Sequence, residues 1–247
     1  MGRRVAAAIL PSGGALGQDK EVRLRGQRLL VPSLLTVLML AILIGLGIWQ
    51  LQRRTWKLGL LAAIDHAEVA PAIPLPDHPT PFAKVRVEGQ IQEDRQAFYG
   101  ADVRDLPSGP TMGARLIEPM DRPGADPVLV DLGWLPTGAH PAPAPSVVEG
   151  YVRAPETPGA FSATDNPGQH LFYTLDPAAI GAALGLARVA PFTLVALGPV
   201  VPGVFPQPAT ALPRPPNDHL NYAITWFSLA ATLAVIFTLY ARKVLHA

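Results

Sequence analysis

Two long, uncharged apolar runs lie near the two ends of the chain. The first covers residues 34–49 and is extended backward by residues 31–33, and the second covers residues 222–240. A helix needs about 20 apolar residues to cross a bilayer. We therefore predict two transmembrane helices, one over residues 29–50 with Pro32 in its first turn and one over residues 219–240.

A cleaved signal peptide is the alternative interpretation of the first run. The run is longer than the roughly 7–15 residues usual for the core of a signal peptide, and no small-residue cleavage site follows it. The residues that follow are typical of the boundary of a membrane anchor: Trp49, Gln50, Leu51, Gln52, Arg53 and Arg54.

Between the two runs the pattern changes to short strands separated by proline and glycine. Apolar and charged residues alternate over residues 83–89, which predicts a half-buried strand, and residues 96–103 are predicted to be its neighbour. Further strands are predicted over 111–119, 128–135, 146–153, 171–174 and 190–197. The segment 128–135 is almost continuously apolar, so we expect it in the centre of the sheet.

One short helix is predicted within this region. Asp176 can cap it, Pro177 suits its first position, and residues 178–186 continue it. The predicted class is an α+β membrane protein in which two transmembrane helices bracket an antiparallel β-rich domain, as an open sheet or a partly closed barrel. The domain covers residues 51–216 and starts with a helical stalk. We predict a disordered tail over residues 1–28 and a short tail over 241–247.

Basic residues around the two runs predict the orientation of the chain. Cytoplasmic flanks of membrane spans carry an excess of Lys and Arg. Eight such residues flank the runs on the side of the termini: Arg3, Arg4, Lys20, Arg23, Arg25, Arg28, Arg242 and Lys243. Four flank them on the side of the intervening domain: Arg53, Arg54, Lys57 and Arg214. Both termini are therefore predicted to be cytoplasmic and the domain extracytoplasmic.

Composition and motifs exclude several classes of function. The net charge of +1 indicates no nucleic-acid partner, and the absence of cysteine excludes disulfides and thiolate chemistry. The sequence has no nucleophile elbow, phosphate loop, zinc-binding helix or dinucleotide fingerprint. Asp102 and Asp105 flank a predicted turn, and four histidines are scattered without metal-ligand spacing: His66, His78, His140 and His170. We therefore expect no enzyme.

One cluster of polar and aromatic residues stands at the ends of the two spans. On a helix His219, Tyr222, Ala223 and Trp226 share a face. A neutral imidazole can bind haem iron, aromatic neighbours can pack on a porphyrin, and arginine suits a propionate. The end of the first span adds Trp49, Gln50, Arg53 and Arg54. The alternative is that all of these are interfacial anchors, with Asn217 or Asp218 as a helix cap.

The two bracketing segments resemble the surfeit locus protein 1 family. They are residues 49–57 (WQLQRRTWK) and 219–227 (HLNYAITWF). Between them, residues 85–89, the strand with Gly133 and Trp134, and residues 148–153 follow in the order of the family, and the resemblance covers residues 34–240. The sequence departs from the family pattern at four positions: Asp131, Leu132, Phe172 and Asp218.

The resemblance implies a factor that assembles haem-copper cytochrome c oxidase. Family members are linked to delivery of haem a to the large oxidase subunit, and His219 matches the histidine proposed to contact the haem iron. The implied partners are that subunit, other assembly factors and the lipid bilayer. A haem-independent scaffold for an oxidase subunit is the alternative, and a haem-modifying enzyme is a third hypothesis. The N-terminal segment lacks the character of a transit peptide, which favours a bacterial inner (plasma) membrane over a mitochondrial inner membrane.

Overall fold

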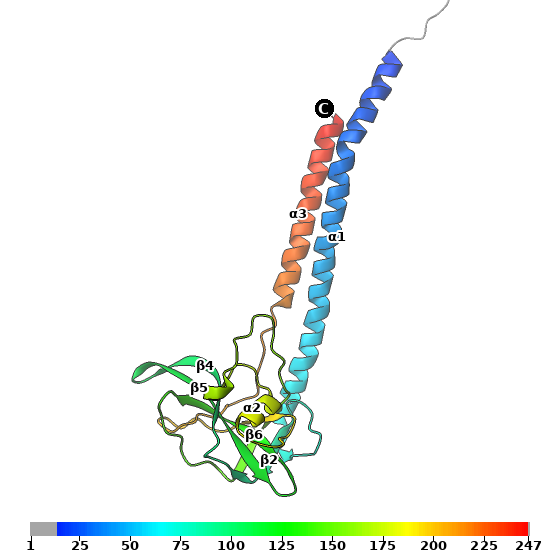
Figure 1. Cartoon of the computed structure of the whole chain (residues 1–247). Coiled ribbons are helices and arrows are strands. Elements are labelled where there is room, and N and C mark those ends of the chain that lie inside the picture. The colour runs from blue at the N-terminus through cyan, green and yellow to red at the C-terminus, as the bar shows by residue number, and fades with distance from the viewer. Residues whose placement is uncertain (1–13, 247) are drawn as a thin grey trace, which may run out of the picture. The chain divides into compact units, whose positions relative to one another are not determined.

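The computed structural model describes residues 14–246, with side chains from residue 29 onward (Figure 1). The chain forms two compact units: a helical unit of Met1–Leu60 and Pro216–Ala247, and a sheet unit of Leu61–Pro215. Of the predicted disordered tail, residues 1–13 lie outside the described residues, whereas residues 14–28 are helical. Ala247, in the predicted C-terminal tail, also lies outside them.

Two long helices carry the apolar runs. Helix α1 extends over Gly14–Val69 and helix α3 over His219–His246. Pro32 lies inside α1 rather than in its first turn, because the helix begins well before the apolar run. The predicted stalk is helical, and it continues α1 without a break up to Val69.

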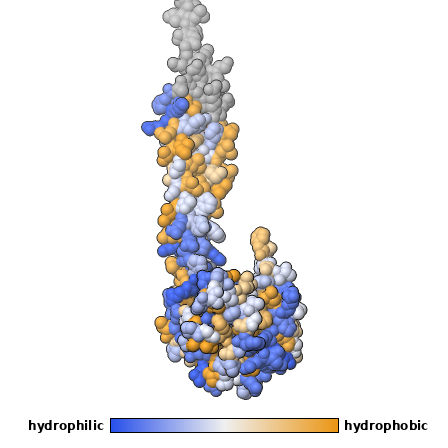
Figure 2. Space-filling model, turned by 90° about the vertical axis from the view of Figure 1, so that its left-hand side faces the viewer, coloured by the Kyte–Doolittle hydropathy of each residue, from blue (hydrophilic) through white to orange (hydrophobic). Residues whose placement is uncertain are grey.

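The apolar surface of both helices is mostly uncovered. Only 6% of the most apolar window of α1 and 11% of that of α3 is buried. Leu35 and Ile236, for example, are 61% and 59% exposed. Figure 2 shows hydrophobic side chains gathered along this pair of helices. The helix of a protein core would be covered, whereas these two are long and apolar enough to cross a membrane.

The sheet unit contains a nine-stranded mixed sheet. Its order is β1-β2-β7-β9-β6-β5-β4-β8, and β3 pairs with β5. The bounds are β1 Ile73–Pro74, β2 Lys84–Glu88, β3 Gln90–Ile91, β4 Ala97–Leu106, β5 Gly109–Arg122, β6 Ala125–Pro136, β7 Val147–Arg153, β8 Leu171–Phe172 and β9 Thr193–Ala196. A single turn of 3₁₀ helix, Pro167–Gln169, precedes β8.

The prediction of an antiparallel sheet is wrong. Three pairs are parallel: β1 with β2, β4 with β8, and β6 with β9. Parallel neighbours need a long crossover, and the chain supplies one because it forms β7 and helix α2 (Pro177–Ala183) before it returns as β9. The predicted pairing of 83–89 with 96–103 is also wrong, since β2 pairs with β1 and β7.

Strand β6 is central, as its continuous apolar pattern predicts. It pairs with β5 on one side and β9 on the other. Its alternate residues enter two hydrophobic clusters: Val128, Val130 and Leu132 belong to the larger one, and Leu129 to a smaller one. The smaller cluster also contains Ile180 of α2, so α2 covers this face of the sheet.

Helix α2 begins where predicted and ends earlier. Asp176 Oδ1 accepts a hydrogen bond from the Ala178 backbone N–H at 2.9 Å, so Asp176 is the N-cap. Gly185 adopts a φ of 73°, and the N–H groups of Gly185 and Leu186 donate to the carbonyls of Ala182 and Gly181. This arrangement is a Schellman motif, and it stops the helix before residue 186.

Gly133 and Trp134 have a structural explanation. Gly133 has a φ of 121°, and a Cβ at this position would lie 2.0 Å from the carbonyl oxygen of Gln207. Trp134 exchanges both backbone hydrogen bonds with Gln207, at 2.9 and 2.8 Å, and its indole is fully buried. Glycine is therefore required at position 133, where the segment around Gln207 pairs with β6.

Candidate functional site

His219 and Gln50 meet between the two long helices. Nδ1 of His219 lies 2.7 Å from Oε1 of Gln50, a hydrogen bond that joins α3 to α1. His219 is the first residue of α3, and the carbonyl of Asp218 accepts from the N–H groups of Asn221 and Tyr222 at 3.0 and 3.3 Å. Asp218 is therefore the N-cap residue of α3, and His219 lies in the first turn of the helix.

The α1–α3 interface continues from this bond along both helices. Leu43, Gly47 and Gln50 are the buried residues of α1 here, at spacings of four and three. On α3, Ala223 and Ala230 are buried. Between them Phe227 meets Gly47, because a Cβ on Gly47 would lie 2.6 Å from the Phe227 ring. Small residues allow two helices to approach closely in a membrane.

The other predicted site residues are more exposed. Tyr222 is 57% and Trp49 53% exposed, and Trp226 is half-buried. The guanidinium of Arg53 lies 4.0 Å from the centre of the Trp56 ring, a cation–π contact within α1, and Arg54 is half-buried. Of the predicted set, the structure brings Gln50 into contact with His219; the remaining residues lie on the same two helices.

Residues 29–246 contain no metal site built from several protein ligands. No group of three or more His, Asp or Glu side chains there could hold a metal ion. Asn217, considered as a cap, has a buried Oδ1 without a hydrogen-bond partner among the described residues. Because Nδ1 of His219 is bonded to Gln50, only its other ring nitrogen, Nε2, is left as a possible ligand for a metal ion.

The sheet unit holds a buried ion pair that sequence reasoning missed. Arg115 Nε on β5 donates to Asp131 Oδ2 on β6 at 2.5 Å, and the Asp131 side chain is fully buried. The Gly133 N–H donates to the other oxygen at 3.1 Å. Burial raises the pKa of Asp131, and the Arg115 guanidinium and the Gly133 N–H oppose this effect. The sequence feature that could have indicated this pair is the carboxylate of Asp131 within the otherwise apolar stretch of β6.

A second polar group connects β4 with the end of β7. Arg153 donates to Glu156 and, at 3.0 Å, to the hydroxyl of Tyr99, and that hydroxyl lies 3.1 Å from Glu156. The Leu175 N–H also donates to Glu156 at 3.0 Å. Desolvation would raise the pKa of Glu156, but the Leu175 N–H, Arg153 and Tyr99 outweigh it and lower the pKa. These contacts tie the end of β7 to the segment before α2.

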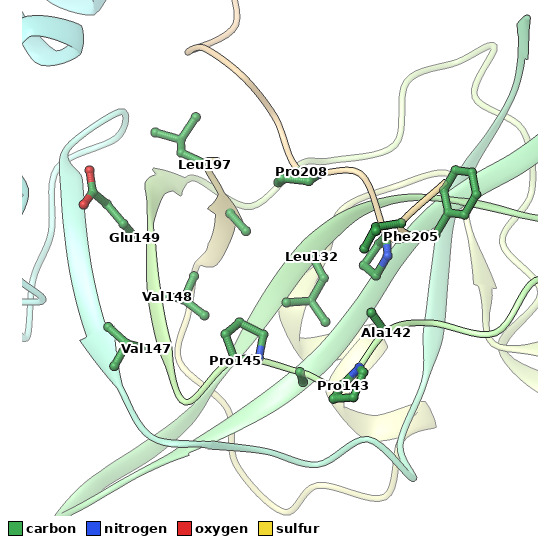
Figure 3. Close-up of a pocket in the computed structure, with 14 residues that line it drawn as sticks. Leu132, Ala142, Pro143, Pro145, Val147, Val148, Glu149, Leu197, Phe205 and Pro208 are labelled. Carbon is green, nitrogen blue, oxygen red and sulfur yellow. The ribbon is translucent and has the colours of Figure 1, made fainter. Parts of the chain in front are cut away.

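Two mainly apolar hollows of the sheet unit have charged residues in their lining. One, of 460 Å³, is lined by Pro81, Phe82, Tyr151, Arg153, Ala154, Glu156, Pro213, Arg214 and Pro215. The other, of 200 Å³, lies between β6 and two proline-containing segments, and Figure 3 shows Leu132 pointing into it and the carboxylate of Glu149 turned away. Arg153 pairs with Glu156, and Arg214 pairs with Asp65 and Glu68. Neither hollow gathers a catalytic constellation.

Comparison with known proteins supports the family resemblance. The sequence model of the SURF1 family matches residues 37–231. The SURF1-like protein of Rickettsia felis is 29% identical over 226 residues, which cover 86% of this chain and 98% of that protein. Surfeit locus protein 1 is 28% identical in Rattus norvegicus, over 81% of this chain and 72% of that protein, and 26% identical in Homo sapiens, over 78% and 71%. The matched region contains both bracketing segments, His219 and Gln50, and the chain belongs to the SURF1 family.

Proposed function

We propose that this chain is a non-enzymatic assembly factor for haem-copper cytochrome c oxidase that holds haem a for the large oxidase subunit. Membership of the family supports the link to the oxidase. The observation that supports haem binding is the position of His219, which is the first residue of α3 and has its Nδ1 bonded to Gln50, so that Nε2 is the nitrogen left for an iron. The partners would be the large subunit and other assembly factors.

The residues present fit a haem cargo better than a bare metal ion. A porphyrin supplies four nitrogen ligands of its own, so one imidazole is enough to bind its iron. His219 offers one nitrogen, in a chain whose described residues hold no multi-ligand metal group. A single protein ligand also suits a carrier that must release its cargo.

Side chains near His219 suit the porphyrin ring and the propionate groups of a haem. Tyr222 and Trp226 follow His219 at helical spacing and offer aromatic surface to a ring. Arg53 is held against Trp56 at 4.0 Å, and a guanidinium can pair with a propionate. In this proposal α1 and α3 cross the bacterial inner membrane with both ends in the cytoplasm, and the sheet unit lies outside.

A deletion strain complemented with variants tests the proposal. Reduced-minus-oxidised spectra of the membranes should lose the a-type haem signal in the deletion while b- and c-type signals stay. His219→Ala should reproduce this loss although the protein accumulates, whereas His246→Ala, at the other end of α3, should complement. An unchanged a-type signal in the deletion would reject the oxidase role. A normal signal with His219→Ala would reject haem handling and favour the haem-independent scaffold.

A further inference from the structure

Gln50 is a buried amide at the interface of two apolar helices. Its residue is 9% exposed, whereas Gln52, two positions along α1, is exposed. A buried amide is costly unless it is hydrogen-bonded. Oε1 of Gln50 lies 2.7 Å from Nδ1 of His219, and this hydrogen bond satisfies the amide oxygen and links residues far apart in the sequence.

The chemistry of this bond decides which ring nitrogen carries the proton. An amide oxygen only accepts, so Nδ1 of His219 must donate its hydrogen to Gln50. A neutral imidazole has one N–H, which leaves Nε2 with a lone pair.

We propose that Gln50 is a positioning residue that holds His219 as the Nδ1–H tautomer and presents Nε2 to a haem iron. This inference rests on the proposed function, in which His219 binds the iron. In this role Gln50 acts through His219 and does not itself contact the haem. An acceptor behind a ligating imidazole fixes the ring and raises its basicity, and its loss typically weakens metal binding about 10–100-fold.

The tautomer can be read without any haem. The full chain, labelled with ¹⁵N-histidine and purified in detergent, is studied by NMR at about pH 8.5, above the ordinary histidine pKa of about 6.5. The His219 signals are identified by their absence in His219→Ala. We expect Nδ1 to be protonated and Nε2 unprotonated. Gln50→Leu should shift His219 toward the Nε2–H form, Gln50→Glu should keep the Nδ1–H form, and Gln52→Leu is the matched control without effect.

Haemin titration of the same proteins supplies the second readout. Gln50→Leu should weaken binding about 10–100-fold, and Gln50→Glu should restore it and shift the iron–imidazole stretching band to higher frequency. The Glu variant guards against a folding defect in the Leu variant, because only a hydrogen-bonding role predicts rescue by a carboxylate acceptor.

The outcomes separate this inference from the proposed function. An Nε2–H tautomer in the unmodified chain, or equal tautomers in the unmodified chain and Gln50→Leu, would overturn the role of Gln50. Unchanged haemin affinity in His219→Ala, with the tautomers as expected, would overturn the haem function instead.

Discussion

Gly47 of α1 and Phe227 of α3 lie so close that a Cβ on Gly47 would be 2.6 Å from the phenyl ring. The two residues belong to the same α1–α3 interface as the Gln50–His219 bond. Gly45, two positions earlier, faces open space, and a Cβ there would have no neighbouring atom within 4 Å. Comparing substitutions at Gly47 and Gly45 therefore distinguishes the effect of close packing from the general effect of replacing glycine in a helix.

Gly47→Ala should weaken the α1–α3 interface, because the added methyl meets the Phe227 ring. The expected result is a lower midpoint of thermal unfolding for the purified chain in detergent. Gly45→Ala should keep or raise the midpoint, since alanine favours a helix over glycine by about 1 kcal/mol. Adding Phe227→Ala to Gly47→Ala should recover part of the loss. Equal midpoints for the two glycine variants would argue against a tight contact here.

The buried Arg115–Asp131 pair should matter far more than a surface pair. Removing one partner of a buried ion pair strands a charge and costs about 3–5 kcal/mol, so Asp131→Ala should lower the free energy of unfolding by that amount. The matched control is Asp126→Ala, whose partner Arg188 is 81% exposed, and an exposed pair contributes about 0–1 kcal/mol. Denaturant unfolding of both variants measures the difference, and similar losses would contradict it.

Glu156 should make the sheet unit sensitive to acid. Its pKa is lowered from the ordinary value of 4.5 in the folded chain, so the unfolded chain binds the proton more readily. The resulting stability is fully present above the ordinary pKa and is lost as the pH falls through the lowered one. The midpoint difference between the unmodified chain and Glu156→Gln should therefore shrink from pH 7 to pH 3. A difference that stays constant over this range would show that the Glu156 carboxyl does not have a lowered pKa.

The orientation can be tested cleanly because the chain has no cysteine. Ser108, in the turn between β4 and β5, and His246, at the end of α3, are both exposed. Ser108→Cys should react with a membrane-impermeant maleimide in spheroplasts, whereas His246→Cys should react only after the membrane is permeabilised. The reverse pattern would place the sheet unit in the cytoplasm.

Patterns within one element predicted much of this structure. The continuous apolar stretch of 128–135 predicted the central strand β6, and Asp176 with Pro177 predicted the start of α2. Pairing was not predictable in the same way, because alternation shows which side of a strand is buried and says nothing about which strand lies beside it. The parallel place of β9 next to β6 depends on the crossover through α2.

The sequence could suggest candidate site residues, but it could not predict the contact between Gln50 and His219. Gln50 and His219 stand out because polar groups interrupt the ends of apolar runs, yet their bond depends on how α1 and α3 pair. Asp131 was noticed only as a departure from the family pattern. Its partner Arg115 follows from the register of β5 on β6, which shifts between Leu116 and Ile117.

The place of β9 between β6 and β7 sets the order in which the sheet can be completed during synthesis. Both neighbours leave the ribosome before β9, and until residues 193–196 follow, each presents an unpaired edge. Helix α1 precedes them all, so in the proposed membrane topology the growing chain would be anchored while its sheet is incomplete. A chain that stops short of Thr193 would carry two open strand edges to which other chains can add.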